Sequence, residues 1–97
     1  MHIRTLADLK RIPVGTRLRL VHSLLGPIDK ARVVEKVQTN AIAFRTEDNR
    51  VSWLHLPKAK NFEATTNGFR IWETWEEHGQ ERRQLGAEYI FEGEQTQ

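Results

Sequence analysis

Residues 62–72 read Phe-Glu-Ala-Thr-Thr-Asn-Gly-Phe-Arg-Ile-Trp, and they contain the strongest indication of the fold class. Asn67-Gly68 predicts a two-residue type I′ turn, because Asn and Gly tolerate the positive φ angles that this turn needs. Pairing outward from the turn places Ala64 opposite Ile71. One face of the hairpin then carries the apolar side chains of Phe62, Ala64, Phe69 and Ile71. The stretch therefore predicts a β-hairpin that covers a core.

Short alternating segments separated by turn residues lie on both sides of this hairpin. Strands are expected at residues 16–21, 32–38, 41–45, 50–56 and 87–91. The segment 26–30 is expected to be a loop, and residues 39–40 and 47–49 are expected to be turns. Leu18 and Leu20 should face the core in the first strand, and Ile42 and Phe44 in the third, with Ala41, Ala43 and Arg45 facing outward.

Two further segments remain to be assigned. Thr5 followed by Asp8 resembles a capping box, and Pro13 cannot continue a helix, so a short helix is expected over residues 5–12. Residues 73–86 allow either a hairpin that turns at His78-Gly79 or a solvated helical turn. Gly79 and Gly86 favour the hairpin, because glycine weakens a helix.

A short helix followed by five or more short strands predicts one domain, residues 1–97, of the mainly β class. The expected architecture is a small antiparallel β-barrel, similar in its order of elements to Src-homology-3-like, Sm-like and Tudor-like barrels. Residues 93–97 are polar and are expected to form a flexible tail.

Charge is divided along the chain. Residues 1–60 carry twelve Lys and Arg against five Asp and Glu, a net of +7, and residues 61–97 carry three against eight, a net of −5. These values give the overall net charge of +2. A chain divided in this way can form one basic and one acidic surface, which points to binding partners rather than to a reaction.

The amino-acid composition argues against several other classes of protein and of binding site. The chain has no Cys, which excludes disulfides and fits a cytoplasmic location. No apolar run approaches the roughly 20 residues that span a bilayer, and the N-terminus has no secretory pattern, so no membrane association is expected. No cofactor or metal is expected either, because none of the residues His2, His22, His55 and His78 is spaced as a ligand pair.

Catalysis is not expected. Ser23 and Ser52 lack the Gly-x-Ser-x-Gly motif, and the carboxylate pairs Glu47/Asp48 and Glu76/Glu77 lie in polar turn-like segments. No positioned acid, base or nucleophile is evident, so we predict that the protein is not an enzyme.

Nucleic-acid binding is the leading hypothesis. Cationic side chains lie on the expected strands or near their ends, and an aromatic side chain among them is available to stack on a base. The residues are Arg17, Arg19, Arg32, Lys36, Arg45, Arg50, Trp53, Lys58 and Lys60. The alternative for the cations is the ordinary solvated face of alternating strands, and for Trp53 a place in the core or at its rim.

The alternative partner is a protein. Trp and Arg are enriched at interface hot spots, and Trp72 lies on the hairpin face opposite Phe69 and Ile71. Trp72 and Trp75 are therefore candidates for an exposed interface, with acidic residues and arginines around them. The residues of this alternative site are Arg70, Trp72, Trp75, Glu76, Glu77, Arg82 and Arg83. A homo-oligomer is a third possibility.

Six short pieces between Leu9 and Ile71, about two-thirds of the chain, resemble small uncharacterised proteins of bacterial phages and prophages. They are Ile12-Pro13-Val14-Gly15-Thr16, Leu25-Gly26-Pro27, Val37-Gln38-Thr39-Asn40, Ser52-Trp53-Leu54, Pro57-Lys58-Ala59 and Gly68-Phe69-Arg70-Ile71. The resemblance implies an accessory phage protein that binds nucleic acid or blocks a host defence protein. It assigns no residue a role.

Overall fold

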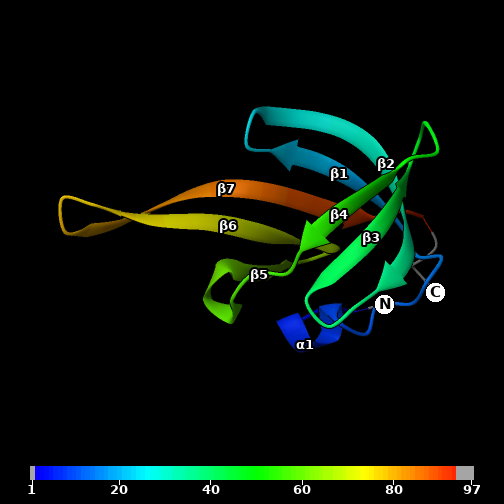
Figure 1. Ribbon diagram of the computed structural model, residues 1–97, viewed down its shortest axis with the longest axis horizontal. Coiled ribbons are helices and arrows are strands. Elements are labelled where there is room, and N and C mark those ends of the chain that lie inside the picture. The colour runs from blue at the N-terminus through cyan, green and yellow to red at the C-terminus, as the bar shows by residue number, and fades with distance from the viewer. Residues whose placement is uncertain (1, 94–97) are drawn as a thin grey trace.

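The computed structural model describes residues 2–93 and shows one antiparallel sheet of seven strands with one short α-helix (Figure 1). The elements in chain order are α1 (Leu6–Leu9), β1 (Arg17–Ser23), β2 (Gly26–Val37), β3 (Ala41–Thr46), β4 (Val51–His55), the 3₁₀ turn η1 (Ala59–Asn61), β5 (Phe62–Thr65), β6 (Gly68–Glu77) and β7 (Gln80–Phe91). The strand order is β4-β3-β2-β1-β7-β6-β5, so β4 and β5 are the two edges. The predicted mainly β class is confirmed.

The sheet curls around the core. Phe44 of β3 stacks on Tyr89 of β7 with ring centroids 5.4 Å apart, although β2 and β1 lie between these strands. A flat sheet would separate β3 from β7 by about 14 Å, three strand spacings. Phe69 stacks on the same tyrosine at 5.0 Å and on Phe62 of β5 at 5.9 Å, so one row of aromatic rings links β3, β7, β6 and β5.

The N-terminal segment closes one side of this core. The Thr5 hydroxyl accepts a hydrogen bond from the Asp8 N–H (3.1 Å), and the Asp8 carboxylate accepts from the N–H of Thr5 (3.2 Å), which completes the predicted capping box. The α-helix is shorter than the expected 5–12, and turn hydrogen bonds carry the chain on to Ile12. Leu9 at the end of α1 and Ile12 just after it are buried, so the N-terminal segment packs on the sheet through these side chains.

The turn predicted at Asn67-Gly68 is wrong by one position. Thr65 pairs with Gly68 and Ala64 with Phe69, so Thr66 and Asn67 form the turn, and neither Asn67 nor Gly68 has a positive φ. A Cβ on Gly68 would lie 1.9 Å from the carbonyl oxygen of Tyr89. Gly68 therefore serves close strand packing rather than a left-handed turn. The prediction of which side chains share a face is still correct, because the observed pairing differs from the predicted one by two residues. A shift of two leaves every side chain on the same face.

The segment 26–30 is strand rather than loop, and this prediction is wrong. β2 begins at Gly26 and pairs with β1, so the connection is the short turn at Leu24-Leu25. The Gly26-Pro27 pair does not break the ladder because it lies at the beginning of the strand, where proline is tolerated. In its pairing with β3, β2 has a register shift between Val34 and Lys36.

The β3–β4 hairpin has the predicted strands and turn but not the predicted burial. Ile42 and Phe44 are buried as expected, but Ala41 and Ala43 are buried as well, so they are not outward-facing surface residues. The predicted hairpin at His78-Gly79 is confirmed, and the expected last strand, 87–91, is the end of β7. Of the expected flexible tail, residues 94–97 lie outside the described residues.

Candidate functional site

The β6–β7 hairpin extends well beyond the rest of the sheet (Figure 1). β5 pairs with β6 only as far as Ile71, and β1 pairs with β7 only as far as Ala87. Beyond these residues, β6 and β7 pair only with each other, from Trp72 opposite Leu85 to Glu77 opposite Gln80. We call residues 72–85 the arm. The arm lies along the longest dimension of the molecule, which measures 44 × 27 × 25 Å.

The local sequence explains the end of the arm. His78 has a φ of 54° and Gly79 a φ of 79°, the positive values that a type I′ turn requires at both central positions. Glu76 and Glu81 lie directly opposite each other, an unfavourable pair of like charges. Arg82 offsets part of this repulsion through an ion pair with Glu77 at 3.7 Å. The tip therefore has the backbone geometry of a favourable turn, but its side-chain charges do not all stabilise it.

Trp72 is held in place at the base of the arm. Its indole Nε1 donates a hydrogen bond to Glu63 of β5 (2.9 Å), and the guanidinium of Arg83 lies 3.9 Å from the centre of the indole ring. A cation over an indole face is attracted by the ring's negative potential. Trp72 therefore connects the arm to β5, which favours a structural role for this residue.

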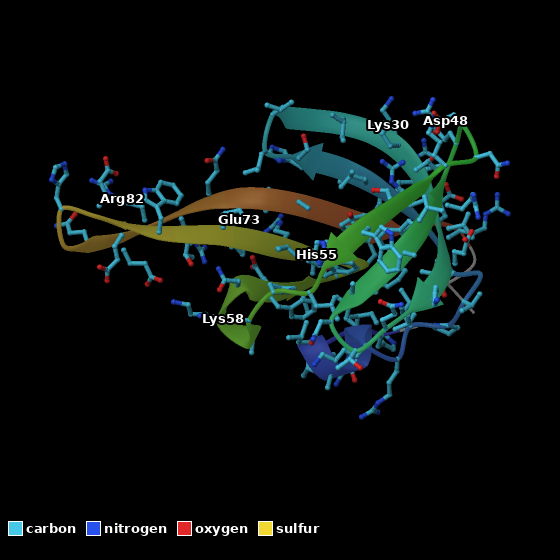
Figure 2. The ribbon with its side chains drawn as sticks, in the orientation of Figure 1. Lys30, Asp48, His55, Lys58, Glu73 and Arg82 are labelled. Carbon is cyan, nitrogen blue, oxygen red and sulfur yellow. The ribbon has the colours of Figure 1, made fainter. Side chains whose placement is uncertain are left out.

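Trp75 lies farther out and on the opposite face. Alternation along β6 places it with Glu73 and Glu77, and its cross-strand partner is Arg82. The side chain of Trp75 is 44% exposed. Figure 2 shows Arg82 near the free end of the arm, at the opposite end of the molecule from Asp48. Of the two tryptophans predicted for a protein interface, Trp75 is the one that the fold leaves open.

Two exposed leucines that are not among the predicted site residues lie beside the base of the arm. Leu24 and Leu25 form the β1–β2 turn, and Leu25 is 98% exposed. The amide of Gln84 in β7 donates to the carbonyl oxygen of Leu24 at 3.4 Å, which places this turn against the arm. The signal available in the sequence was the apolar pair directly before Gly26, but the loop expected at 26–30 concealed the turn.

The structure therefore brings together only some of the residues predicted for a protein interface. Trp75, Glu76, Glu77 and Arg82 lie on the outer part of the arm, and Trp72 and Arg83 brace its inner part. Arg70 lies on the body of the sheet, where its guanidinium is 3.3 Å from Glu88 and 3.8 Å from Glu63.

The cations of the nucleic-acid hypothesis do not form one patch. Arg17 and Arg45 both pair with Val33 across the strands and share its face, whereas Arg32 is opposite the buried Leu18 and lies on the other face. Five of the eight cations form ion pairs with carboxylates within 4 Å: Arg17, Arg19, Arg45, Arg50 and Lys60. Within residues 2–93, Arg32, Lys36 and Lys58 have no such partner.

Arg19 shows how strongly these charges are compensated. Its guanidinium lies 2.5 Å from Asp29, 2.9 Å from Glu92 and 3.9 Å from Glu47. The hydrogen bonds to Asp29 and Glu92 raise the pKa of Arg19. Arg45 is paired similarly, with both Nε and Nη2 donating to the carboxylate of Glu35. These arginines hold neighbouring strands together and present little free positive charge.

Trp53 is on the surface rather than in the core. It is 46% exposed on β4 and pairs with Ala43 of β3, which in turn pairs with Lys36 of β2. Cross-strand partners share a face, so Trp53 and Lys36 lie on the same face. Trp53 is therefore accessible to a partner, although four of the five arginines predicted with it, Arg17, Arg19, Arg45 and Arg50, form ion pairs with carboxylates.

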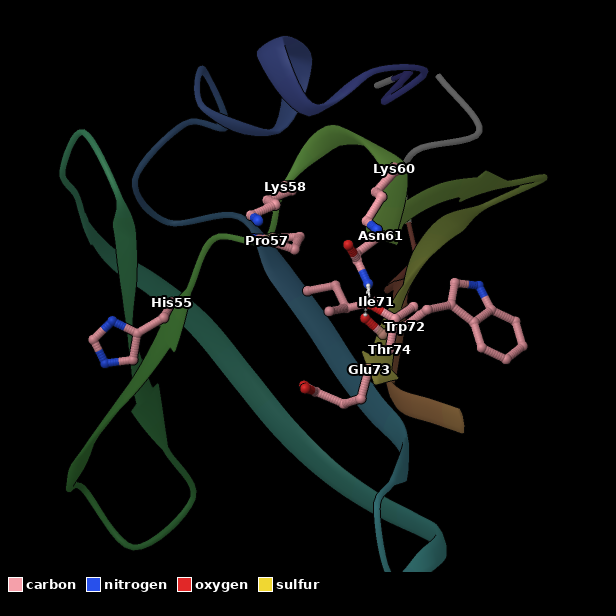
Figure 3. A pocket seen from close by; sticks show the side chains of 9 residues that line it. All are labelled: His55, Pro57, Lys58, Lys60, Asn61, Ile71, Trp72, Glu73 and Thr74. Carbon is pink, nitrogen blue, oxygen red and sulfur yellow. Dashed lines mark hydrogen bonds between the residues drawn. The ribbon is translucent and has the colours of Figure 1, made fainter. Parts of the chain in front are cut away.

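A hollow of about 330 Å³ separates the end of β4 from the base of the arm (Figure 3). His55 and Glu73 lie on opposite sides of it, and Trp72 points away from it. Asn61 is buried and donates to the carbonyl oxygen of Trp72 (2.8 Å) and to the Thr74 hydroxyl (3.1 Å), so it anchors η1 to the arm. The hollow marks the gap between the two sides of the curled sheet.

Comparisons with protein-family models, with curated proteins and with solved structures gave no match. In the part of the chain that the structure describes, no three His, Cys, Asp or Glu side chains are grouped so as to hold a metal ion. No helix among residues 2–93 has the length and apolar character needed to cross a membrane.

Proposed function

We propose that this chain is a non-enzymatic binding module that docks on another protein through the outer part of the arm. The observation that carries the proposal is the exposure of Trp75 beside Arg82 on a hairpin that extends away from the core. Trp and Arg supply much of the binding energy at protein interfaces. The exposed leucines at the β1–β2 turn add apolar surface near the base of the arm.

The curled sheet with its two free edges supports a second, structural part of this proposal. We infer that the body is an open form of a small barrel of the Src-homology-3-like or Sm-like type, from which the arm projects. The resemblance to phage accessory proteins makes a host protein the expected class of partner.

The test is capture of a binding protein on the immobilised chain. Trp75→Ala is expected to weaken binding of the captured protein by at least tenfold, because truncation of a hot-spot residue costs about 2 kcal/mol or more. Trp53→Ala removes an equally exposed tryptophan that lies on β4, outside the arm, and is the matched control. A captured protein that binds both variants equally would refute docking through the arm.

Nucleic-acid binding stays a prediction, and it has a separate test. Lys36 and Lys58 are the appropriate residues to reverse, because they have no carboxylate partner within residues 2–93 and their loss breaks no ion pair of the fold. If the chain binds oligonucleotides, its affinity should fall steeply with salt and should fall further in Lys36→Glu/Lys58→Glu. Such a result, together with no captured protein that depends on Trp75, would replace the proposed function by nucleic-acid binding.

A further inference from the structure

β4 is an edge strand with an uncovered hydrogen-bonding side. The N–H of Leu56 donates to the carbonyl oxygen of Asn40 (2.9 Å), and the carbonyl oxygen of Arg50 accepts from Thr46 (2.8 Å). In an antiparallel ladder, alternate residues direct both backbone groups to the same neighbour. The backbone groups of Ser52 and Leu54 therefore form hydrogen bonds with β3, as those of the flanking residues Arg50 and Leu56 do.

The intervening residues, Val51, Trp53 and His55, direct their N–H and C=O groups away from β3. The sheet order places no strand on that side within residues 2–93. The β3–β4 register has no shift, so the exposed groups form a regular row. This row can accept another strand.

β4 also lacks the features that usually protect an edge strand. Natural edges carry charged side chains, proline or a bulge that prevents pairing with another chain. No charged residue and no proline lies between Val51 and Leu56, and Val51 and Trp53 are 43% and 46% exposed. The opposite edge, β5, carries Glu63 in a strand of four residues. The unprotected edge is thus specific to β4.

We infer that the partner of this edge is β4 of a second copy of the chain, paired antiparallel about Trp53. A two-fold axis at Trp53 aligns Val51 with His55 of the other copy and Trp53 with its own equivalent. Every residue in these pairs directs its backbone groups outward, so the register forms about six hydrogen bonds between the copies.

The side chains favour self-pairing over pairing with a charged strand. No side chain between Val51 and Leu56 carries a charge that could pair with a charged partner strand. Pairing of two copies of β4, in contrast, brings no like charges together. Trp53 meets Trp53 on the surface beside Ala43, and aromatic cross-strand pairs stabilise sheets. The pairing joins two sheets into one continuous sheet.

The mass of the full chain in solution, measured by light scattering or sedimentation over a range of concentrations, tests this inference. The wild type is expected to dimerise. Trp53→Pro is expected to be monomeric, because it removes the central outward N–H, and proline is tolerated on an edge strand where that group faces solvent. Trp53→Lys should also be monomeric, because it opposes two charges at the axis, and it replaces the proline variant if that variant does not fold.

Trp75→Lys is the matched control, since it changes the arm and should remain dimeric. A single-cysteine variant, Trp53→Cys, gives an independent readout, because the chain has no other cysteine. Residues at the axis lie about 5.5 Å apart between Cα atoms, within disulfide range, so oxidation should link the two copies. A monomeric wild type, or a dimer that persists in both Trp53→Pro and Trp53→Lys, would overturn the inference without affecting the test of Trp75.

Discussion

Two glycines of this chain are required for different physical reasons. Gly68 has an ordinary φ but approaches the backbone of β7, whereas Gly79 lies in open space with a φ of 79°. Glycine provides both properties, absence of a Cβ and freedom of φ, and each position uses only one of them. The same residue type therefore cannot be assigned one role from the sequence.

Gly68→Ala should destabilise the fold much more than Gly79→Ala. The added Cβ at position 68 would collide with the carbonyl oxygen of Tyr89, so β6 and β7 must separate, at a cost of about 3 kcal/mol or more. At position 79, alanine has space and incurs only the left-handed backbone cost of about 1–2 kcal/mol. Urea denaturation of the two variants measures the difference, and equal losses would contradict this account of Gly68.

Tyr89 should make stability depend on alkaline pH. Burial raises the pKa of Tyr89 to about 12 from its ordinary value of 10.0. The unfolded chain therefore loses this proton at a lower pH than the folded chain does. The contribution is fully present below pH 10 and is lost as the pH rises towards 12, by roughly 1.4 kcal/mol for each pH unit.

Tyr89→Phe isolates this effect, because it keeps the ring between Phe44 and Phe69 and removes only the hydroxyl. Urea denaturation of the wild type and the variant between pH 9 and 11.5 should show a steeper loss of stability in the wild type. Parallel curves would mean that the hydroxyl is not responsible.

At the scale of elements, the arm is a two-stranded ribbon that contributes little to the core. A lone hairpin is marginally stable in water, so the arm depends on contacts at its base. Those contacts are the bonds of Asn61 to the arm and the position of Trp72 between Glu63 and Arg83. The outer residues make only surface ion pairs, such as that of Lys60 with Glu81 at 3.0 Å.

Replacing residues 76–81 by Asn-Gly should leave the body of the protein intact. The new turn closes on Trp75 and Arg82, which already face each other across the strands. The two surface ion pairs that are lost, Lys60–Glu81 and Arg82–Glu77, contribute at most about 1 kcal/mol each, so the free energy of unfolding should change by about 2 kcal/mol or less. Urea denaturation checks this, and a loss above about 3 kcal/mol would show that the tip supports the core.

At the scale of the whole molecule, one row of aromatic rings holds the curled sheet together. Phe44 and Tyr89 come from strands that are three places apart in the sheet, and their contact requires the curl. Phe44 is almost completely buried, and Phe62 at the other end of the row is only partly buried. The stability of the curled form should therefore depend most on Phe44.

Phe44→Ala should cost about 3–5 kcal/mol, which is much of the stability of a domain of this size. Phe62→Ala, the control, should cost clearly less, because β5 can adjust at the edge of the sheet. Thermal and urea unfolding measure both variants. Equal costs would indicate that the two sides of the sheet are held together by other contacts.

The secondary-structure class, the alternation of most strands and the capping box could be predicted from the sequence, which also favoured the hairpin at His78-Gly79 over a helical turn. These depend on local properties: periodicity, side-chain capping and permitted φ angles. The prediction from the sequence misplaced the turn near Gly68 and the beginning of β2. Whether a glycine is needed for its φ angle or for its lack of a side chain depends on how close a neighbouring strand lies. Whether a Gly-Pro pair interrupts a ladder also depends on the neighbouring strand.

The distribution of charge and of exposed side chains over the surface, in contrast, depends on the folded arrangement of the strands. The sequence identified the cations, but the sheet order brings Glu35, Asp29 and Glu92 next to them and places Arg32 on the other face. It likewise separates Trp72, held between two charged residues, from the exposed Trp75. Pair interactions between distant residues depend on register and curl, which arise from packing over the whole chain and not from local preference.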